Sequence, residues 1–211
     1  MKTKIAIDLN DVIRSYTSQF ASQYKKDIDP HFDIDNVNIE SSDLTQTFPF
    51  DSEEEYQDFV YTDHPYELFG CAEPMARQLQ FRFHEWLGND LRNIVDEDDN
   101  PNEPDVMLVS PFEINLTIQA SLYFLHKIAS RVREYYFPKD SLTIWDRCDI
   151  LITANPWLLD NKPEGKVSIK IKSSYNTESE ADYEFDSFME LMQGGTTVSY
   201  THLRAHETAA N

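Results

Sequence analysis

The chain has 211 residues, with 38 Asp and Glu against 18 Lys and Arg, so its formal net charge is −20. Such a charge repels nucleic-acid backbones and anionic lipid over about 8 Å at physiological salt, which disfavours a nucleic-acid polymer or a membrane as partner. The two cysteines have no metal-ligand spacing, and the sequence has neither a signal segment nor a long apolar run. We therefore expect a cytoplasmic protein with reduced thiols, long enough for one α/β core with an insertion.

The first predicted strand leads directly into a polar loop. Residues Lys2 to Asp8 form a short apolar run that ends in a carboxylate, which is typical of a buried parallel strand whose carboxyl end faces a site. Apolar residues then recur at helical spacing from Val12 to Tyr24, so we expect a helix to begin directly after the loop 8–11. Residues 27–70 are rich in Asp, Ser, Thr, Pro and aromatic residues, which predicts an inserted lobe of loops and short helices.

The rest of the chain alternates between helical and strand patterns. In order, it predicts a helix over Glu73 to Ile94, a strand over Val106 to Val109, a helix over Leu116 to Tyr136, strands over Leu142 to Trp145, Asp149 to Thr153 and Val167 to Ile171, and a closing helix around Phe185 to Leu191. The loop 96–105 superficially resembles a calcium loop, but Pro101 and Met107 stand where such a loop needs Gly and Glu. The alternation predicts a parallel sheet covered by helices.

Polar side chains follow three of these strands. They are Asp8, Asn10 and Asp11 after the first strand, Ser110 after the second, and Thr153 and Asn155 near Pro156. Ligands of open α/β sheets bind at the carboxyl ends of strands, so we expect these side chains to share one site. Each also has a simpler reading, because Asp at a strand-to-helix junction is often a helix cap and Ser before Pro is often a turn residue.

The order of these motifs resembles the haloacid dehalogenase (HAD) superfamily of phosphohydrolases. Asp8-Leu9-Asn10-Asp11-Val12 resembles the DxDx(T/V) motif I, Ser110 resembles motif II, and Asp149 to Pro156 is similar to the D(V/I)LIDDRP motif IV of the 5'-nucleotidase, or deoxyribonucleotidase-like, branch. The resemblance covers about Lys2 to Ile171. It implies a Rossmannoid core over 1–26 and 71–193, with a small, mainly helical cap over 27–70 inserted after the first strand.

The resemblance also implies a set of roles. In this family the first motif I Asp attacks phosphorus, the second protonates the leaving oxygen, and a Ser or Thr and a Lys or Arg hold the phosphoryl oxygens. Carried over, Asp8 matches the nucleophile, Asn10 stands at the acid/base position, and Ser110 matches the phosphate-binding hydroxyl. The basic residue is ambiguous, with Arg147 as the first candidate and Lys139 as the second.

The implied magnesium site departs from the family pattern. Mg²⁺ would be held by Asp8, the carbonyl of Asn10 and the position of Thr153, but Thr153 and Ala154 replace the motif IV acids, so we expect Mg²⁺ to bind weakly or not at all. The Asn10 amide cannot donate a carboxylic proton, a loss of roughly 10²- to 10⁴-fold in rate. Asp11 stands where the family often has Gly, and we expect its side chain to point elsewhere.

Three hypotheses about function follow. The first is a HAD-like protein related to Mg-dependent 5'-nucleotidases and phosphatases, weak or inactive as a catalyst, with a small phosphorylated molecule as its ligand. The second is a competent Mg-dependent phosphomonoesterase that uses Asp8. The third is a binding or scaffold protein that uses the aromatic-rich lobe 48–69. Residues 194–211, with His202 and His206, resemble translated sequencing-adapter read-through and are expected to be non-native.

Overall fold

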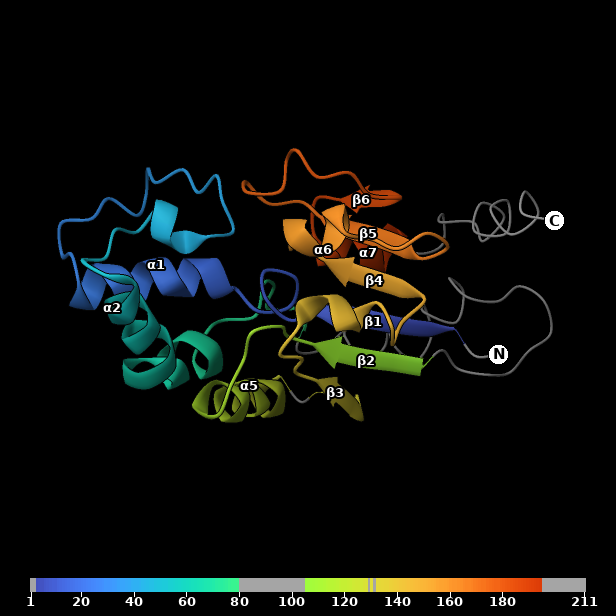
Figure 1. Cartoon of the computed structure of the whole chain (residues 1–211), viewed down its shortest axis with the longest axis horizontal. Coiled ribbons are helices and arrows are strands. Elements are labelled where there is room, and N and C mark those ends of the chain that lie inside the picture. Colours follow the sequence, from blue (N-terminus) through green and yellow to red (C-terminus); the bar gives the residue numbers. More distant parts are fainter. Residues whose placement is uncertain (1–2, 80–104, 129, 131, 195–211) are drawn as a thin grey trace.

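A parallel sheet forms the centre of the molecule. The computed structural model describes residues 3–79, 105–128, 130 and 132–194 (Figure 1). Six parallel strands lie in the order β3-β2-β1-β4-β5-β6. They are β1 (Lys4–Asp8), β2 (Asp105–Val109), β3 (Glu134–Tyr136), β4 (Ile150–Thr153), β5 (Val167–Ile171) and β6 (Tyr183–Phe185). Strand β1 is central, so both of its faces are buried.

The strand register places the polar loops at one edge. Asp8 pairs with Val109 of β2, and Ile7 pairs with Ile152 of β4, so the three strands end together. The chain leaves β1 toward β2 and β3 and later returns to the other side of β1 with β4. The crevice between β1 and β4 is therefore the point where the strand order reverses, and ligands of such sheets bind there.

Helices cover the sheet on its two faces. The elements are η5 (Ser141–Ile144), α5 (Leu116–Lys127), α6 (Pro156–Asp160) and α7 (Phe188–Gly194). Alternate residues of β1 enter opposite cores: Ile5 and Ile7 pack with Phe124 and Phe188, whereas Ala6 packs with Trp145 and other residues. This alternation follows from the two-residue period of a strand. No helix in the described ranges is long and apolar enough to cross a membrane.

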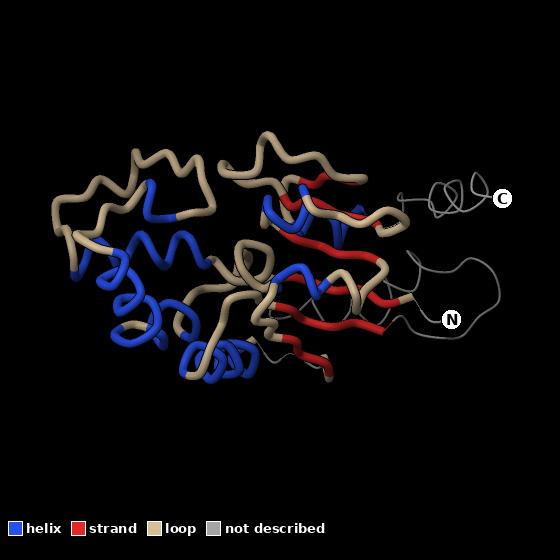
Figure 2. Tube along the Cα trace, viewed as in Figure 1, coloured by secondary structure: helices blue, strands red, loops and turns tan. Residues whose placement is uncertain are grey.

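A helical lobe lies beside the carboxyl edge of the sheet (Figures 1 and 2). Its elements are α1 (Tyr16–Asp27), the 3-10 helix η1 (Leu44–Gln46), α2 (Glu53–Asp58) and two short π-helices, η2 (Phe59–Asp63) and η3 (Tyr66–Gly70). Its aromatic residues form their own core, in which the Phe20 ring lies 5.2 Å from that of Phe48 and 5.4 Å from that of Phe59. The aromatic-rich composition of this segment thus builds the inside of the lobe.

The structure confirms the parallel α/β sheet with helices, and the strands over 106–109, 150–153 and 167–171. Two predicted elements are wrong. The segment expected as a strand over Leu142 to Trp145 is the 3-10 helix η5, whose first turn is capped by the Asp140 carboxylate accepting from the Leu142 N–H at 3.0 Å. The helix expected to run to Tyr136 ends at Lys127, and its last three residues form β3.

The start of α1 also differs from the expectation. The helix begins at Tyr16 rather than directly after residue 11, because residues 11–14 turn and Arg14 pairs with Asn10 and Pro74 in isolated bridges. The helix predicted from Glu73 does not begin there, since residues 73–78 form turns and bends. Its remainder, the calcium-like loop up to residue 104 and the tail from 195 lie outside the described residues. Strand β6 was not predicted.

Candidate active site

Asp8 is the central carboxylate of the candidate site. It ends β1 and is 1% exposed. The Thr153 hydroxyl donates to Asp8 Oδ2 at 2.8 Å, and the Asn10 backbone N–H donates to Asp8 Oδ1 at 3.3 Å. The structure therefore brings together Asp8, Asn10 and Thr153 in the crevice between β1 and β4.

Burial raises the pKa of Asp8 to about 7. The hydrogen bonds from Thr153 and Asn10 and the positive charge of Arg14 oppose this rise, whereas the neighbouring Asp11 carboxylate adds to it. The cause is desolvation, since a carboxylate removed from water loses hydration that two hydrogen bonds only partly replace. Asp8 is therefore a carboxyl group that changes its protonation state near neutral pH.

Asp11 faces the same cavity as Asp8, so the expectation that its side chain points elsewhere is wrong. Its backbone is in the left-handed region, with φ of 56°, and this turn directs the side chain inward. The carboxylate accepts hydrogen bonds from the Thr17 N–H at 3.0 Å, the Thr17 hydroxyl and the Tyr175 hydroxyl at 2.8 Å. Burial raises the pKa of Asp11 as well, against the effect of these donors.

A cavity of about 80 Å³ lies over Asp8. Its walls come from the loop after β1, the start of α1, the lobe and the loops after β4 and β5: Asp8, Asn10, Asp11, Tyr16, Thr17, Ser42, Leu44, Asn155 and Tyr175. This volume suits a phosphoryl-sized group, because pockets for whole organic ligands measure about 300–1,000 Å³. The lobe closes the cavity through Ser42 and Leu44, and the Ser174 hydroxyl donates to the Ile39 carbonyl of the lobe at 2.6 Å.

Ser110 is fully buried directly after β2. It contacts Arg14, a residue that was not predicted to belong to the site. Arg14 Nη2 donates to Ser110 Oγ at 3.4 Å and forms an ion pair with Glu113 Oε1 at 2.8 Å. Arg14 Nε and Nη2 also donate to Asn10 Oδ1 at 3.0 and 2.5 Å, so Ser110 and Asn10 share one guanidinium. The available signal was a charged residue directly after the apolar pair Val12 and Ile13.

The structure does not bring Arg147 or Lys139 to this cavity. Arg147 is exposed and precedes the amino end of β4, and its guanidinium carbon lies 4.0 Å from the centre of the Tyr136 ring. Lys139 is exposed in the loop between β3 and η5. In this conformation, neither side chain is among the residues that line the cavity over Asp8.

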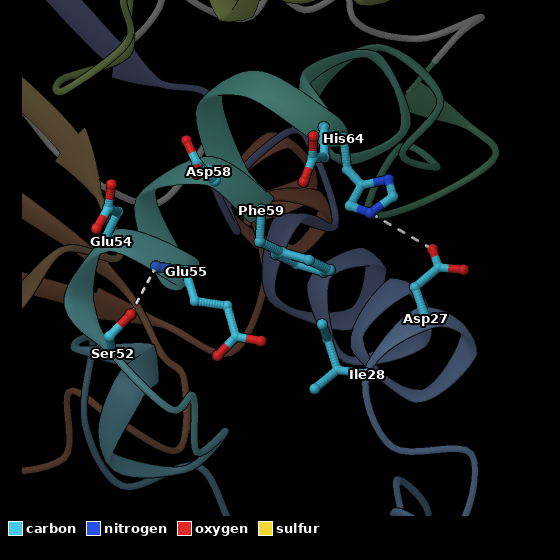
Figure 3. A pocket seen from close by; sticks show the side chains of 9 residues that line it. Asp27, Ile28, Ser52, Glu54, Glu55, Asp58, Phe59 and His64 are labelled. Carbon is cyan, nitrogen blue, oxygen red and sulfur yellow. Dashed lines mark hydrogen bonds and ion pairs between the residues drawn. The ribbon is translucent and has the colours of Figure 1, made fainter.

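A larger cavity of about 480 Å³ lies in the lobe, between the end of α1 and α2 (Figure 3). Five carboxylates line it: Asp27, Glu54, Glu55, Asp58 and Asp63. His64 Nε2 lies 3.6 Å from Asp27 Oδ2, and Phe59 and Ile28 supply apolar surface. This cavity shares no lining residue with the one over Asp8, and none of the site residues predicted from the sequence lines it. The candidate active site is therefore the smaller cavity.

Two carboxylates of the smaller cavity, those of Asp8 and Asp11, could hold Mg²⁺. No group of three or more His, Cys, Asp or Glu residues in the described ranges is arranged to hold a metal ion. However, Mg²⁺ commonly uses one or two carboxylates and keeps several waters beside a substrate phosphate. Asp8 and Asp11 bring two carboxylates into one cavity, and the raised pKa of each shows that a nearby positive charge does not offset its burial.

The fold is similar to that of solved haloacid dehalogenase-like proteins. A proposed haloacid dehalogenase-like hydrolase from Burkholderia xenovorans LB400 aligns with 91% of this chain and 95% of its own at 9% identity, with a TM-score of 0.50. A haloacid dehalogenase-like family hydrolase from Xanthomonas campestris aligns with 99% of this chain and 97% of its own at 11% identity, with a TM-score of 0.50. No family model matches the sequence, and no curated protein is similar to it. At these identities the likeness establishes the fold.

Proposed function

We propose that the protein is a slow phosphomonoesterase that acts on a small phosphorylated molecule, with Asp8 as the nucleophile. One observation carries the proposal. A buried carboxylate ends the central strand, at the point where the strand order reverses, and faces a cavity of about 80 Å³. The fold shared with HAD-like hydrolases supports the same reaction class, which the motif resemblance implies independently.

The described residues supply the parts of a phosphoryl transfer. The ionised Asp8 carboxylate attacks phosphorus while the bond from phosphorus to the leaving oxygen breaks, and water then hydrolyses the aspartyl phosphate to restore Asp8. The Thr153 hydroxyl and the Asn10 backbone N–H hold the Asp8 carboxylate in place. Bound Mg²⁺, held by Asp8, Asp11 and the Asn10 carbonyl, would supply the positive charge that lets a carboxylate approach a phosphate.

The reaction is slow because position 10 cannot donate a proton. The leaving oxygen must take its proton from water, since the Asn10 amide offers only a hydrogen bond. General acid catalysis typically contributes 10²- to 10⁴-fold, so a rate lower by roughly that factor is expected. The same feature supports a second candidate function, which is binding of a phosphorylated ligand without turnover.

The substrate class is a further part of the proposal. The resemblance to the 5'-nucleotidase branch favours a nucleotide, whose phosphate would lie over Asp8. A nucleoside does not fit in about 80 Å³, so it would extend out of the cavity past the lobe residues Ser42 and Leu44.

The test uses a generic chromogenic phosphomonoester with and without Mg²⁺. We expect slow turnover by the full chain that is abolished by Asp8→Asn. Asp149→Asn is the matched control, because Asp149 lies at the opposite, amino edge of the sheet, where one of its oxygens accepts from the Lys4 N–H at 3.0 Å. Equal turnover by all three proteins would reveal a contaminating enzyme and contradict the proposal. No turnover by any of them, with phosphate binding retained, would favour the second candidate function.

A further inference from the structure

Arg14 is a fully buried arginine in the loop between β1 and α1. Its Nε and Nη2 atoms both donate to Asn10 Oδ1, and Nη2 also donates to Glu113 Oε1. The other acceptors lie on further elements: Ser110 Oγ at 3.4 Å, Ser121 Oγ at 2.5 Å and the Phe69 carbonyl at 3.0 Å. One guanidinium thus joins the loop after β1 to the loop after β2, to α5 and to η3 of the lobe.

The guanidinium of Arg14 makes no direct contact with the space over Asp8. Glu113 forms an ion pair with it, and the side chains of the two residues are 0% and 1% exposed. Arg14 also does not line the cavity over Asp8. Arg14 can therefore position a bound ligand only through a neighbour, and the hydrogen-bonded neighbour that does line the cavity is Asn10.

Arg14 determines which way the Asn10 amide points. An arginine side chain has donors and no acceptor, so the branch of the amide that faces it must be the oxygen. The nitrogen, on the other branch, is then directed away from Arg14. We propose that Arg14 is a positioning residue that fixes Asn10 with its amide N–H groups toward the cavity, where they donate to an oxygen of a bound phosphoryl group.

This inference rests on the proposed function and refines it. The position that carries an acid in HAD phosphohydrolases here carries a fixed hydrogen-bond donor. A donor recognises an oxygen with a free lone pair, such as those of inorganic phosphate or the ester oxygen of a phosphomonoester. The site therefore holds the leaving oxygen by donation and leaves the supply of its proton to water.

A double-mutant cycle tests the coupling. Binding of inorganic phosphate in the presence of Mg²⁺ is measured by calorimetry for the wild type, Asn10→Ala, Arg14→Lys and the double variant. Lysine keeps the charge but has one nitrogen, which cannot hold Asn10 Oδ1 together with the other acceptors. We expect each single change to weaken binding about tenfold, and the double variant to bind no more weakly than Asn10→Ala. A loss of about 100-fold in the double variant would overturn the proposal.

Lys127→Met is the matched control. Lys127 also ties α5 to the chain after η3, because its Nζ donates to the Cys71 and Ala72 carbonyls at 3.1 and 2.8 Å. It does not line the cavity, so its replacement should leave the affinity for phosphate unchanged. A tenfold loss in Lys127→Met would show that any weakened tie between α5 and the lobe lowers binding, which would also overturn the proposal.

A second measurement needs no change at Arg14 and serves if Arg14→Lys fails to fold. The measurement is nuclear magnetic resonance of ¹⁵N-labelled protein. The side-chain amide resonances of Asn10 are identified by their absence from the spectrum of Asn10→Ala. We expect addition of phosphate to shift them. If phosphate binds but these resonances stay in place, the positioning role is overturned while the proposed function stands. If the wild type binds no phosphate at millimolar concentration, the proposed function itself fails.

Discussion

Replacing Asp8 by Asn should stabilise the folded protein at neutral and alkaline pH. The folded-state pKa of Asp8 is about 7, against an ordinary value of 3.8, so the folded protein binds this proton more tightly than the unfolded chain does. Stability from this group is therefore fully present below about pH 4 and is lost as the pH rises through about 7. One pKa unit corresponds to about 1.36 kcal/mol, so the loss amounts to about 4 kcal/mol by pH 8.

Asn at position 8 carries no such charge and avoids the loss. It can still accept the hydrogen bond from Thr153, but its other branch would be an NH₂ group opposite the Asn10 N–H, which offsets part of the gain. We expect Asp8→Asn to raise the free energy of unfolding by about 2–4 kcal/mol at pH 8 and by less than about 1 kcal/mol at pH 4.5. Urea unfolding in EDTA-containing buffer measures both values.

The difference between the gains at the two pH values is the quantity to compare, because titrating groups that do not interact with Asp8 affect both proteins alike. Asp149→Asn, at a side chain that is 53% exposed, should show no such pH-dependent gain. Saturating Mg²⁺ should stabilise the wild type but not Asp8→Asn, and should thereby reduce the gain. An effect of Asp8→Asn that stays the same from pH 4.5 to pH 8 would refute the reasoning about burial.

Three further predictions follow from single contacts. Arg147→Met should leave turnover within about twofold of the wild type in the chromogenic assay, because the guanidinium stacks on Tyr136 rather than facing the cavity. Asn10→Asp alone should not raise turnover, since two donors of Arg14 would hold the new carboxylate ionised and unable to give a proton; a tenfold rise would contradict this. Phe20→Ala should destabilise the lobe by about 3–5 kcal/mol, measured by urea unfolding and near-ultraviolet circular dichroism.

The parts of the fold that the sequence predicts are those with a local signal. Strands β1, β2 and β4 are buried on both faces, so each contains a continuous apolar run, whereas β5 alternates apolar residues with Ser168 and Lys170. The segment Leu142 to Trp145 has the same apolar character but folds into η5, because a 3-10 turn also directs Leu142, Ile144 and Trp145 into the core. Strand β6 has three residues at the edge of the sheet, too few to produce a period.

The residues of the candidate site can likewise be separated into those with a local sequence signal and those without one. Asp8 and Thr153 are predictable because a parallel sheet brings the carboxyl ends of its strands together, and this does not depend on the conformation of the loops. Asp11 depends on a positive φ at a residue other than glycine, which no apolar pattern encodes. Arg14 depends on partners such as Glu113, 99 residues further along the chain.

The chemistry of position 10 is therefore set by two residues together. Asn10 alone indicates only that the acid of the motif it resembles is missing. Bound to Arg14, the same amide becomes an oriented donor, and Asp at this position would become half of an ion pair. A proton donor at position 10 hence requires that Arg14 no longer binds this side chain, and the loss of Arg14 leaves Glu113 buried without its partner. A change of one residue therefore does not create a proton donor here, because the alternative arrangement involves three residues.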